Sequence, residues 1–274
     1  MKRRATVPAR LNIIGEHTDY AGGLALPFAI EHKLVLEANF DVEEYIGDST
    51  VVELWKAADG PPASLTVESD IPIGKGMSSS AALCVAISMC IIGRTESLDC
   101  CILAQKIEHE VLGTKCGLLD QMAIVFAKKG HATMIDFNSQ NIEYIKIRES
   151  WKFKLVDSGI HRTLAQTDYD FTINKCDRHV NEESKRVLLA CHASSNQLGI
   201  LLNESHESLR KLGVSLPAID ARVKQLQELE GVYGARMMGG GFGGMILVLV
   251  NDNSVLPEIP IAHSSSSAFL EELL

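Results

Sequence analysis

The chain has few aromatic side chains and no long apolar run. Phe, Trp and Tyr make up only 5% of its 274 residues, so aliphatic side chains and Met must fill the core. No stretch of about 18 uncharged apolar residues occurs, which argues against a membrane-spanning helix. The basic segment MKRR (residues 1–4) is not followed by an apolar segment, so we do not expect a secretory signal.

The cysteines lack the pattern of a disulfide framework or a zinc site. Seven are present, which is an odd number, and no two of them form a C-x-x-C pair. This usage is typical of reduced thiols in a cytosolic protein. We therefore expect a cytoplasmic location.

The charge balance disfavours two further classes of partner. A formal net charge of -9 argues against general binding to nucleic acid or to an anionic membrane. An anionic small molecule is still possible, because a few local cations and backbone N–H groups suffice to hold a phosphate. The sequence contains no sign of an obligate protein partner.

Hydrophobic periodicity predicts an α+β protein. Residues 33–40 and 64–68 alternate like strands, and the Ala-rich segment 79–93 is typical of a buried helix. Further helices are expected at 99–112, after residue 117, at 177–202 and at 217–229, and further strands at 133–136, 142–147, 153–157 and 245–250. The tail has four serines at 264–267 and is expected to form a loose loop before a short apolar end.

A change of character near residue 149 divides the chain into two halves, residues 1–149 and 150–274. Both halves mix helices and strands, and no flexible linker separates them. We therefore expect the halves to pack together, with a cleft between them.

The densest group of ionisable side chains lies near the start of the chain, in the segment PARLNIIGEHTDYAGG (residues 8–23). Arg10, Glu16, His17 and Asp19 fall within ten positions there, beside small and apolar residues. A soluble core has little use for so many charges at a strand-to-loop transition. The set suits a polyhydroxylated ligand, because carboxylates are strong hydrogen-bond acceptors.

A second segment, IPIGKGMSSSAA (residues 71–82), has the composition of a phosphate-binding loop. Gly74 and Gly76 let the backbone approach an anion, and the serines lead into a helix whose first N–H groups carry the positive dipole end. The Walker A pattern is absent. An ordinary capped helix after a glycine turn explains this segment equally well on its own. A third glycine-rich segment, GARMMGGGFGG (residues 234–244), follows later in the chain. The two glycine-rich segments, together with the candidate sugar ligands, suggest a kinase.

Two acidic residues follow the phosphate loop. Asp120 stands in a largely apolar setting, CGLLDQ (residues 116–121), where a carboxylate near an arginine could act as a base. Glu108 could hold Mg²⁺ beside a serine hydroxyl and a nucleotide. Taken alone, Asp120 is also explained as an acid at a helix N-terminus, and Glu108 as a solvated charge on a helix face.

Together these motifs resemble the galactose-, homoserine-, mevalonate- and phosphomevalonate-kinase superfamily, and within it the galactokinases. GEHTDY (residues 15–20) resembles the galactokinase signature, and GMSSSAA (residues 76–82) resembles the superfamily loop. The order and spacing of the motifs fit from residue 8 to residue 250. The resemblance implies an α+β, two-domain small-molecule kinase fold. Its N-terminal half would be like domain 2 of ribosomal protein S5 and its C-terminal half ferredoxin-like, with the active site in the cleft between.

The resemblance also implies roles for individual residues. Asp120 matches the catalytic aspartate, and Arg10 matches the arginine beside the reacting hydroxyl. The sugar ligands would be Glu16, His17, Asp19 and Tyr169. The ATP phosphates would lie over Gly74, Lys75, Gly76, Met77, Ser78, Ser79, Ser80 and Ala81. The ligands of Mg²⁺ would be Ser79 and Glu108.

The implied activity is the ATP-dependent phosphorylation of galactose at its C1 hydroxyl. Asp120 would accept the proton, while Arg10 would hold Asp120 ionised and offset charge on the phosphoryl oxygens. Kinases for N-acetylgalactosamine, arabinose or galacturonate are alternatives, although Thr18 favours galactose. A non-catalytic galactose sensor is a further alternative, but the Ser80–Ala81 pair that such sensors can lose is intact.

Overall fold

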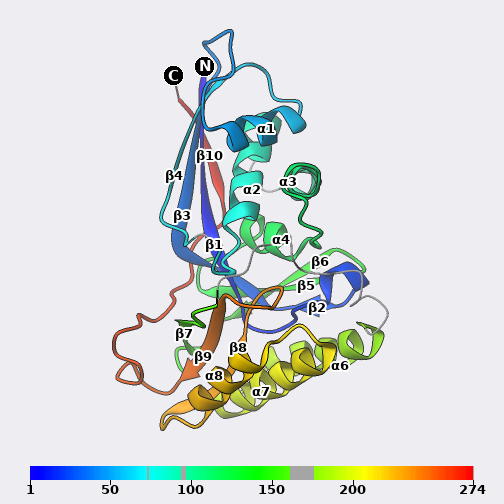
Figure 1. Cartoon of the computed structure of the whole chain (residues 1–274), viewed down its shortest axis with the longest axis vertical. Coiled ribbons are helices and arrows are strands. Elements are labelled where there is room, and N and C mark those ends of the chain that lie inside the picture. Colours follow the sequence, from blue (N-terminus) through cyan, green and yellow to red (C-terminus); the bar gives the residue numbers. More distant parts are fainter. Residues whose placement is uncertain (73, 94–96, 161–175, 274) are drawn as a thin grey trace.

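A computed structural model describes residues 1–72, 74–93, 97–160 and 176–273 of the chain. The upper part of the molecule in Figure 1 is built on a four-stranded antiparallel sheet with the strand order β10-β1-β3-β4. Its strands are β1 (Lys2–Asn12), β3 (Pro27–Asn39), β4 (Ser64–Ser69) and β10 (Phe269–Leu273).

Helices cover one face of this sheet. α2 packs against β1 and β3, α3 packs on α2, and α1 and α4 lie toward opposite ends of α2 (Figure 1). Their bounds are α1 (Ser49–Ala57), α2 (Ser79–Ile92), α3 (Leu98–Leu112) and α4 (Leu119–Val125). Because α2 is enclosed by the sheet and by three helices, it is apolar on nearly every side. This explains the Ala-rich segment without polar periodicity.

A smaller sheet, with the order β2-β5-β6, lies beyond α4. It consists of β2 (Leu24–Ala25), β5 (His131–Asp136) and β6 (Asn141–Lys146). The short helix η1 (Asp19–Ala21) lies in the connection between β1 and β2. That connection contains the charged segment near the start of the chain.

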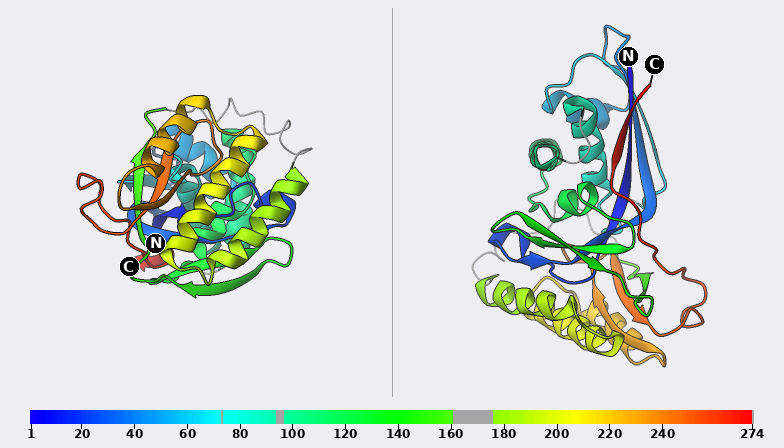
Figure 2. Two further views of the ribbon diagram at one scale, coloured as in Figure 1. Left: turned by 90° about the horizontal axis from the view of Figure 1, so that it is seen from below. Right: turned by 180° about the vertical axis from the view of Figure 1, so that it is seen from behind.

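The lower part of the molecule holds a third sheet, with the order β7-β9-β8. Its strands are β7 (Lys152–Asp157), β8 (Val232–Met237) and β9 (Met245–Val250). The helices are α6 (Cys176–Ala190), α7 (Ser195–Leu212) and α8 (Pro217–Gln227), which lie side by side in the left view of Figure 2. α7 and α8 pack against β8, and α6 packs on α7.

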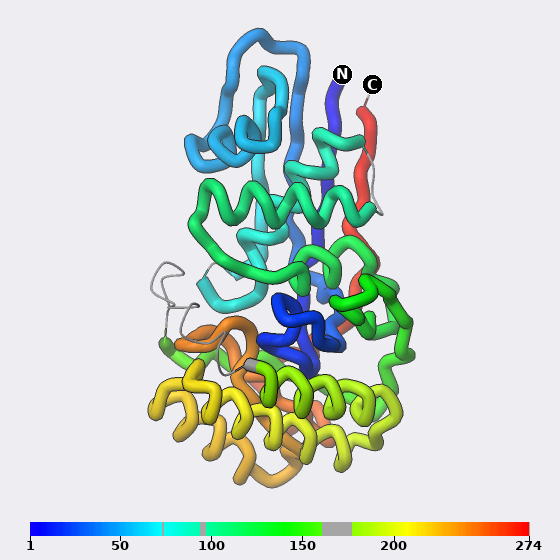
Figure 3. The backbone as a smooth tube through the Cα atoms, turned by 90° about the vertical axis from the view of Figure 1, so that its right-hand side faces the viewer, coloured from blue at the N-terminus to red at the C-terminus, as the bar shows by residue number. Residues whose placement is uncertain are grey.

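Most of the predicted elements are present, but two predictions are wrong. The helix expected over 177–202 is two helices, because α6 ends at Ala190 and Ser194 starts α7 with a capping box to Gln197. The serine loop at 264–267 is not loose, because Ser264 forms a bridge with Ile30 and the N–H of Ser265 donates to the carbonyl oxygen of Ala29 at 2.7 Å. The short apolar end after it is β10, which pairs with β1 and brings the two chain ends together (Figures 1 and 3). The last strand of the second half therefore belongs to the sheet of the first. The boundary near residue 149 stays a prediction.

Within the described part of the chain, none of the helices combines the length and apolar character that a membrane span requires.

Candidate active site

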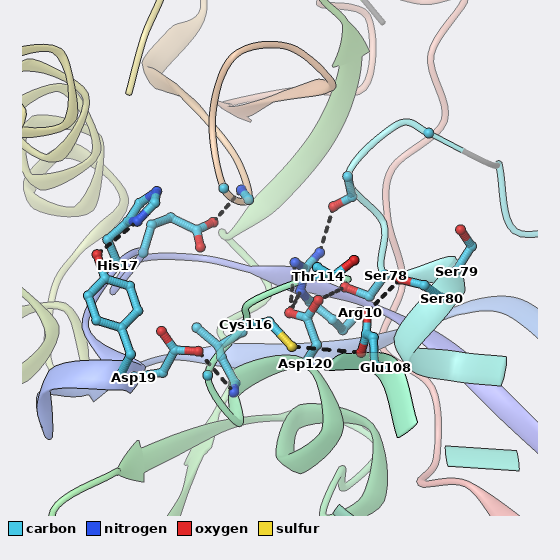
Figure 4. A pocket seen from close by; sticks show the side chains of 18 residues that line it. Arg10, His17, Asp19, Ser78, Ser79, Ser80, Glu108, Thr114, Cys116 and Asp120 are labelled. Carbon is cyan, nitrogen blue, oxygen red and sulfur yellow. Dashed lines mark hydrogen bonds and ion pairs between the residues drawn. The ribbon is translucent and has the colours of Figure 1, made fainter. Parts of the chain in front are cut away.

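A buried ion pair lines the pocket drawn in Figure 4. Arg10, on β1, directs Nε and Nη2 to Asp120 Oδ1, each at 2.8 Å. Its Nη1 donates to the carbonyl oxygen of Gly76 at 2.7 Å. The Arg10 side chain is 4% exposed and that of Asp120 is 28% exposed, so the carboxylate keeps an open side. One guanidinium thus joins the acid at the start of α4 to the glycine loop before α2.

Ser78 makes a second contact with this acid. Its hydroxyl donates to Asp120 Oδ2. Ser78 has a φ of 63°, a left-handed conformation that is uncommon for a residue with a Cβ atom, and its side chain does not cap α2. The ordinary capped helix that composition alone also allowed is therefore not what forms. The N-terminus of α2 keeps N–H groups that its N-cap side chain leaves unbonded.

The third glycine-rich segment meets the phosphate loop. The N–H of Met245 donates to the carbonyl oxygen of Lys75 at 3.1 Å. A Cβ atom added to Gly244 would lie 3.0 Å from that same oxygen. Gly239 and Gly240 line the pocket with the loop residues. The two halves of the chain therefore meet backbone to backbone around one cavity.

The structure brings most of the predicted site residues to this pocket. They are Arg10, Glu16, His17, Asp19, Gly74, Gly76, Ser78, Ser79, Ser80, Glu108 and Asp120. Met77 and Ala81 are buried in the core, so only their backbone could face a phosphate. Lys75 forms an ion pair with Asp157 at 2.6 Å. Tyr169 lies outside the described residues.

Glu108 is buried, so the interpretation of it as a solvated helix charge is wrong. Ser80 donates to Glu108 Oε1 at 2.7 Å (Figure 4). Gln121 donates to Glu108 Oε2 at 2.9 Å. Burial raises the pKa of Glu108 to about 7, although the bond from Ser80 opposes the rise. Ser79 lines the same pocket, and its role as a metal ligand stays a prediction. Ser80 becomes a second candidate for that role.

Asp19 lies at the other end of the pocket, on η1. Its Oδ2 accepts from the backbone N–H of Leu119 at 3.3 Å. Burial raises the pKa of Asp19 to about 6, and the negative charges of Asp120 and Glu16 add to the rise. His17 has its Nδ1 3.1 Å from the hydroxyl of Tyr20.

One carboxylate oxygen of Glu16 already interacts with other residues of the chain. Its Oε1 accepts from the N–H of Gly239 at 2.7 Å and lies 3.2 Å from Arg236 Nη2. Burial opposes ionisation of this group, yet Arg236 and Arg10 together hold the pKa of Glu16 below its usual range. The carboxylate therefore stays charged at neutral pH and links the charged segment to the third glycine-rich segment.

Comparisons with known proteins assign this site to a family. The model of the GHMP kinases N terminal domain matches residues 44–128, and that of the GHMP kinases C terminal domain matches residues 189–259. The galactokinase galactose-binding signature matches residues 2–39. The galactokinase of Thermotoga maritima is 33% identical, across 90% of this chain and 89% of that protein. The chain belongs to the galactokinase family.

Other galactokinases give the same picture. That of Thermosipho africanus is 29% identical, across 92% of this chain and 90% of that protein. The structure of Lactococcus lactis galactokinase complexed with galactose has a TM-score of 0.81 at 23% identity, covering 98% of this chain and 95% of that one. These matches confirm the predicted α+β, two-domain kinase fold and the predicted class of ATP-dependent sugar kinase.

Arg236 and Gly117 are among the residues of this galactokinase-family site that were not predicted. Arg236 is fully buried and donates to the carbonyl oxygens of Asn12, Ile13 and Met237 at 2.6–2.8 Å. Gly117 lies against the segment of residues 8–23, called the sugar motif below. A Cβ atom added to Gly117 would lie 2.1 Å from an Asp19 carboxylate oxygen. The sequence does contain a signal for Arg236, since it is the one charged residue in the strand β8. No local signal marks Gly117.

Proposed function

We propose that this protein transfers the γ-phosphoryl group of ATP to the C1 hydroxyl of galactose. One observation carries the proposal. The carboxylate of Asp120 contacts the guanidinium of Arg10, and that guanidinium also donates to the backbone of the phosphate loop at Gly76. A proton acceptor, a fixed positive charge and a phosphate-binding loop therefore meet in one pocket.

In the proposed reaction, Asp120 takes the proton of the C1 hydroxyl as that oxygen attacks the γ-phosphorus. The bond between the γ-phosphorus and the bridging oxygen breaks, and ADP leaves. Arg10 favours the ionised form of Asp120 and lies where it can offset charge on the phosphoryl oxygens. A general base contributes roughly 10²–10⁴-fold to the rate, and positioning with charge stabilisation supplies the rest.

The proposed sugar site is the group of Glu16, His17 and Asp19, with Tyr169 as a further expected ligand. Its position supports this assignment, because Asp19 on η1 and the proposed base Asp120 on α4 line the same pocket. Ionised carboxylates accept two hydroxyl bonds well, so an epimer with one hydroxyl inverted would leave an acceptor unpaired. This favours a narrow sugar specificity.

The residues beside the phosphate loop also fit Mg²⁺. This ion is usually held by one or two carboxylates together with substrate phosphates, and Glu108 with Ser80 or Ser79 offers a carboxylate and hydroxyl oxygens at that place. When bound, the ion would neutralise charge on the ATP phosphates. The raised pKa of Glu108 follows mainly from burial, and a bound cation would favour the ionised form of this carboxylate.

Two measurements test the function together. A panel of free sugars with Mg-ATP, scored by ADP release, should give galactose as the best substrate. The variant D120N should keep galactose binding by calorimetry but lose at least about 100-fold in kcat, since the base is gone while the shape is kept. D99N is the matched control, because Asp99 is another acid in a first helical turn, on α3, and is exposed.

Near-normal turnover by D120N would remove Asp120 from its proposed role. ADP release with N-acetylgalactosamine, arabinose or galacturonate in preference to galactose would reassign the substrate. Galactose binding without turnover of any sugar in the panel would identify the protein as a sensor.

A further inference from the structure

One helix of the second half holds the sugar motif from behind. His179, Val180, Glu183 and Ser184 are spaced so that they share one face of α6. This face contacts η1, which lies within the sugar motif, and β2, which directly follows it. Figure 1 shows α6 beside both elements. Packing is close enough that a Cβ atom added to Gly23 would lie 2.8 Å from a methyl carbon of Val180.

Two side chains of this face bond directly to the backbone of the motif segment. His179 Nε2 lies 2.9 Å from the carbonyl oxygen of Glu16, and Nδ1 lies 2.8 Å from the hydroxyl of Ser208. Since a carbonyl oxygen only accepts, Nε2 carries the hydrogen of that bond. The hydroxyl of Ser184 accepts from the N–H of Leu24 at 3.1 Å. These two bonds fix the chain on both sides of the sugar ligands.

Glu183 makes a third contact, and its burial is energetically costly. Its side chain is fully buried, and Oε1 accepts from the N–H of Gly15 at 3.1 Å and from the Ser205 hydroxyl at 2.6 Å. Oε2 accepts from Arg186 at 2.7 Å. A buried ion pair often adds no stability over an apolar pair of the same volume. What this side chain provides, and an apolar one cannot, is an oxygen that accepts from the backbone N–H of Gly15.

Gly15 is confined from the opposite side as well. Its φ is 104°, in the region that favours glycine, and an added Cβ atom would lie 2.5 Å from Ala25 Cα and from the Leu24 carbonyl oxygen. The loop therefore cannot relax at this position by moving toward β2. Its orientation depends on the acceptor that α6 supplies.

We propose that Glu183 and His179 are positioning residues for sugar recognition. They act through the backbone of Gly15 and Glu16, and they thereby fix the direction in which the sugar ligands face the pocket. The inference rests on the proposed function, since it takes the pocket to bind galactose. The phosphate loop is held by other contacts, from Arg10 to Gly76 and from Met245 to Lys75, so we expect ATP binding to depend much less on this face of α6.

The test separates the two substrates. In E183A, the KM for galactose should rise about tenfold or more, because a charge-assisted bond to a loop N–H is lost. The KM for ATP, and kcat at saturating galactose, should stay within about twofold. E183Q keeps an acceptor oxygen and should recover most of the affinity. E182Q is the matched control, because Glu182 lies on the same helix, is half-exposed and pairs with Arg178 at the surface.

The same three constants, the KM for galactose, the KM for ATP and kcat, are measured for H179Q. If E183A does not yield folded protein, H179Q alone tests the positioning role. The positioning role is overturned if galactose KM is unchanged in E183A and H179Q, or if both KM values and kcat worsen in parallel. Wild-type protein is assayed first with the sugar panel. Failure of the wild type on galactose counts against the proposed function, and the variants are then compared with the sugar that it does use.

Discussion

Asp19 occupies the least favourable place for a charge among the proposed sugar ligands. It is largely enclosed, it faces two other carboxylates, and the N–H of Leu119 donates to it at 3.3 Å. A sugar hydroxyl would add a further donor to this carboxylate. The environment of Asp19 is thus consistent with a ligand that brings its own hydrogen-bond donors.

This environment predicts a pH effect on stability. Burial, followed by the charges of Asp120 and Glu16, raises the pKa of Asp19 from 3.8 to about 6, so the folded protein binds the proton more tightly than the unfolded chain does. Stability from this group is therefore fully present below pH 4 and falls as pH rises to about 6. D19N should stabilise the sugar-free protein at pH 8 by about 1–2 kcal/mol, after allowance for partial exposure, and should change little at pH 4.

Urea unfolding at the two pH values measures this difference. E53Q serves as a control, because Glu53 is an exposed acid on α1, far from the pocket in sequence and structure. An equal effect of D19N at pH 4 and pH 8 would show that the charge of Asp19 is not the cause. The same variant should lose galactose affinity at pH 8, where the wild-type carboxylate is ionised.

At the scale of elements, the chain entering α4 shapes the sugar site. Gly117, just before α4, and Leu119, its first residue, approach Asp19, one by its lack of a side chain and the other by its N–H. Asp120 lies in the first turn of the same helix. One short turn therefore places the proposed base and limits the position of a proposed sugar ligand.

G117A tests this arrangement. The added methyl group would meet the Asp19 carboxylate at 2.1 Å, and the flexible side chain must swing away. Galactose KM should rise about tenfold or more, because a sugar ligand is displaced, while the melting temperature should change little. In a D19N background the same substitution should cost less affinity, since the two changes act on one contact. Independent, additive losses would contradict the proposed contact.

At the scale of the whole molecule, Arg236 joins the two halves. From β8 it reaches the backbone of Asn12 and Ile13, at the end of β1, and the carboxylate of Glu16. It is fully buried, so each of its donors must be satisfied within the protein. The sugar motif is thus held by Arg236 on one side and by α6 on the other.

R236K should weaken the contacts by which Arg236 joins the two halves. Lysine keeps the charge but not the planar fork that serves several acceptors, so at least two backbone oxygens would lose their donor. We expect a loss of roughly 2 kcal/mol or more in the free energy of unfolding, measured with urea. R178K is the control, because Arg178 is an exposed arginine with one surface partner. Equal stability of R236K and wild type would contradict the proposal that Arg236 stabilises the contact between the two halves.

The sequence alone determined the family, the order of the motifs and most of the elements. These are local properties: glycines and serines at fixed spacing, a carboxylate in an apolar turn, and periodicities within 6 to 15 residues of chain. Apolar segments such as α2 and β9 were predictable because their composition reports burial directly. The ion pair of Arg10 with Asp120 was expected only through the family resemblance, since 110 positions separate the two residues.

Tertiary structure alone decided the environment of each charge. Whether Glu108 is solvated or buried, whether Ser78 caps its helix or bonds to Asp120, and which strand β10 joins all depend on segments far away in the chain. The contacts of Glu183 and Arg236 with the sugar motif span 168 and 220 or more positions. Local sequence carries no information on such contacts, because packing of the whole core selects which distant groups meet.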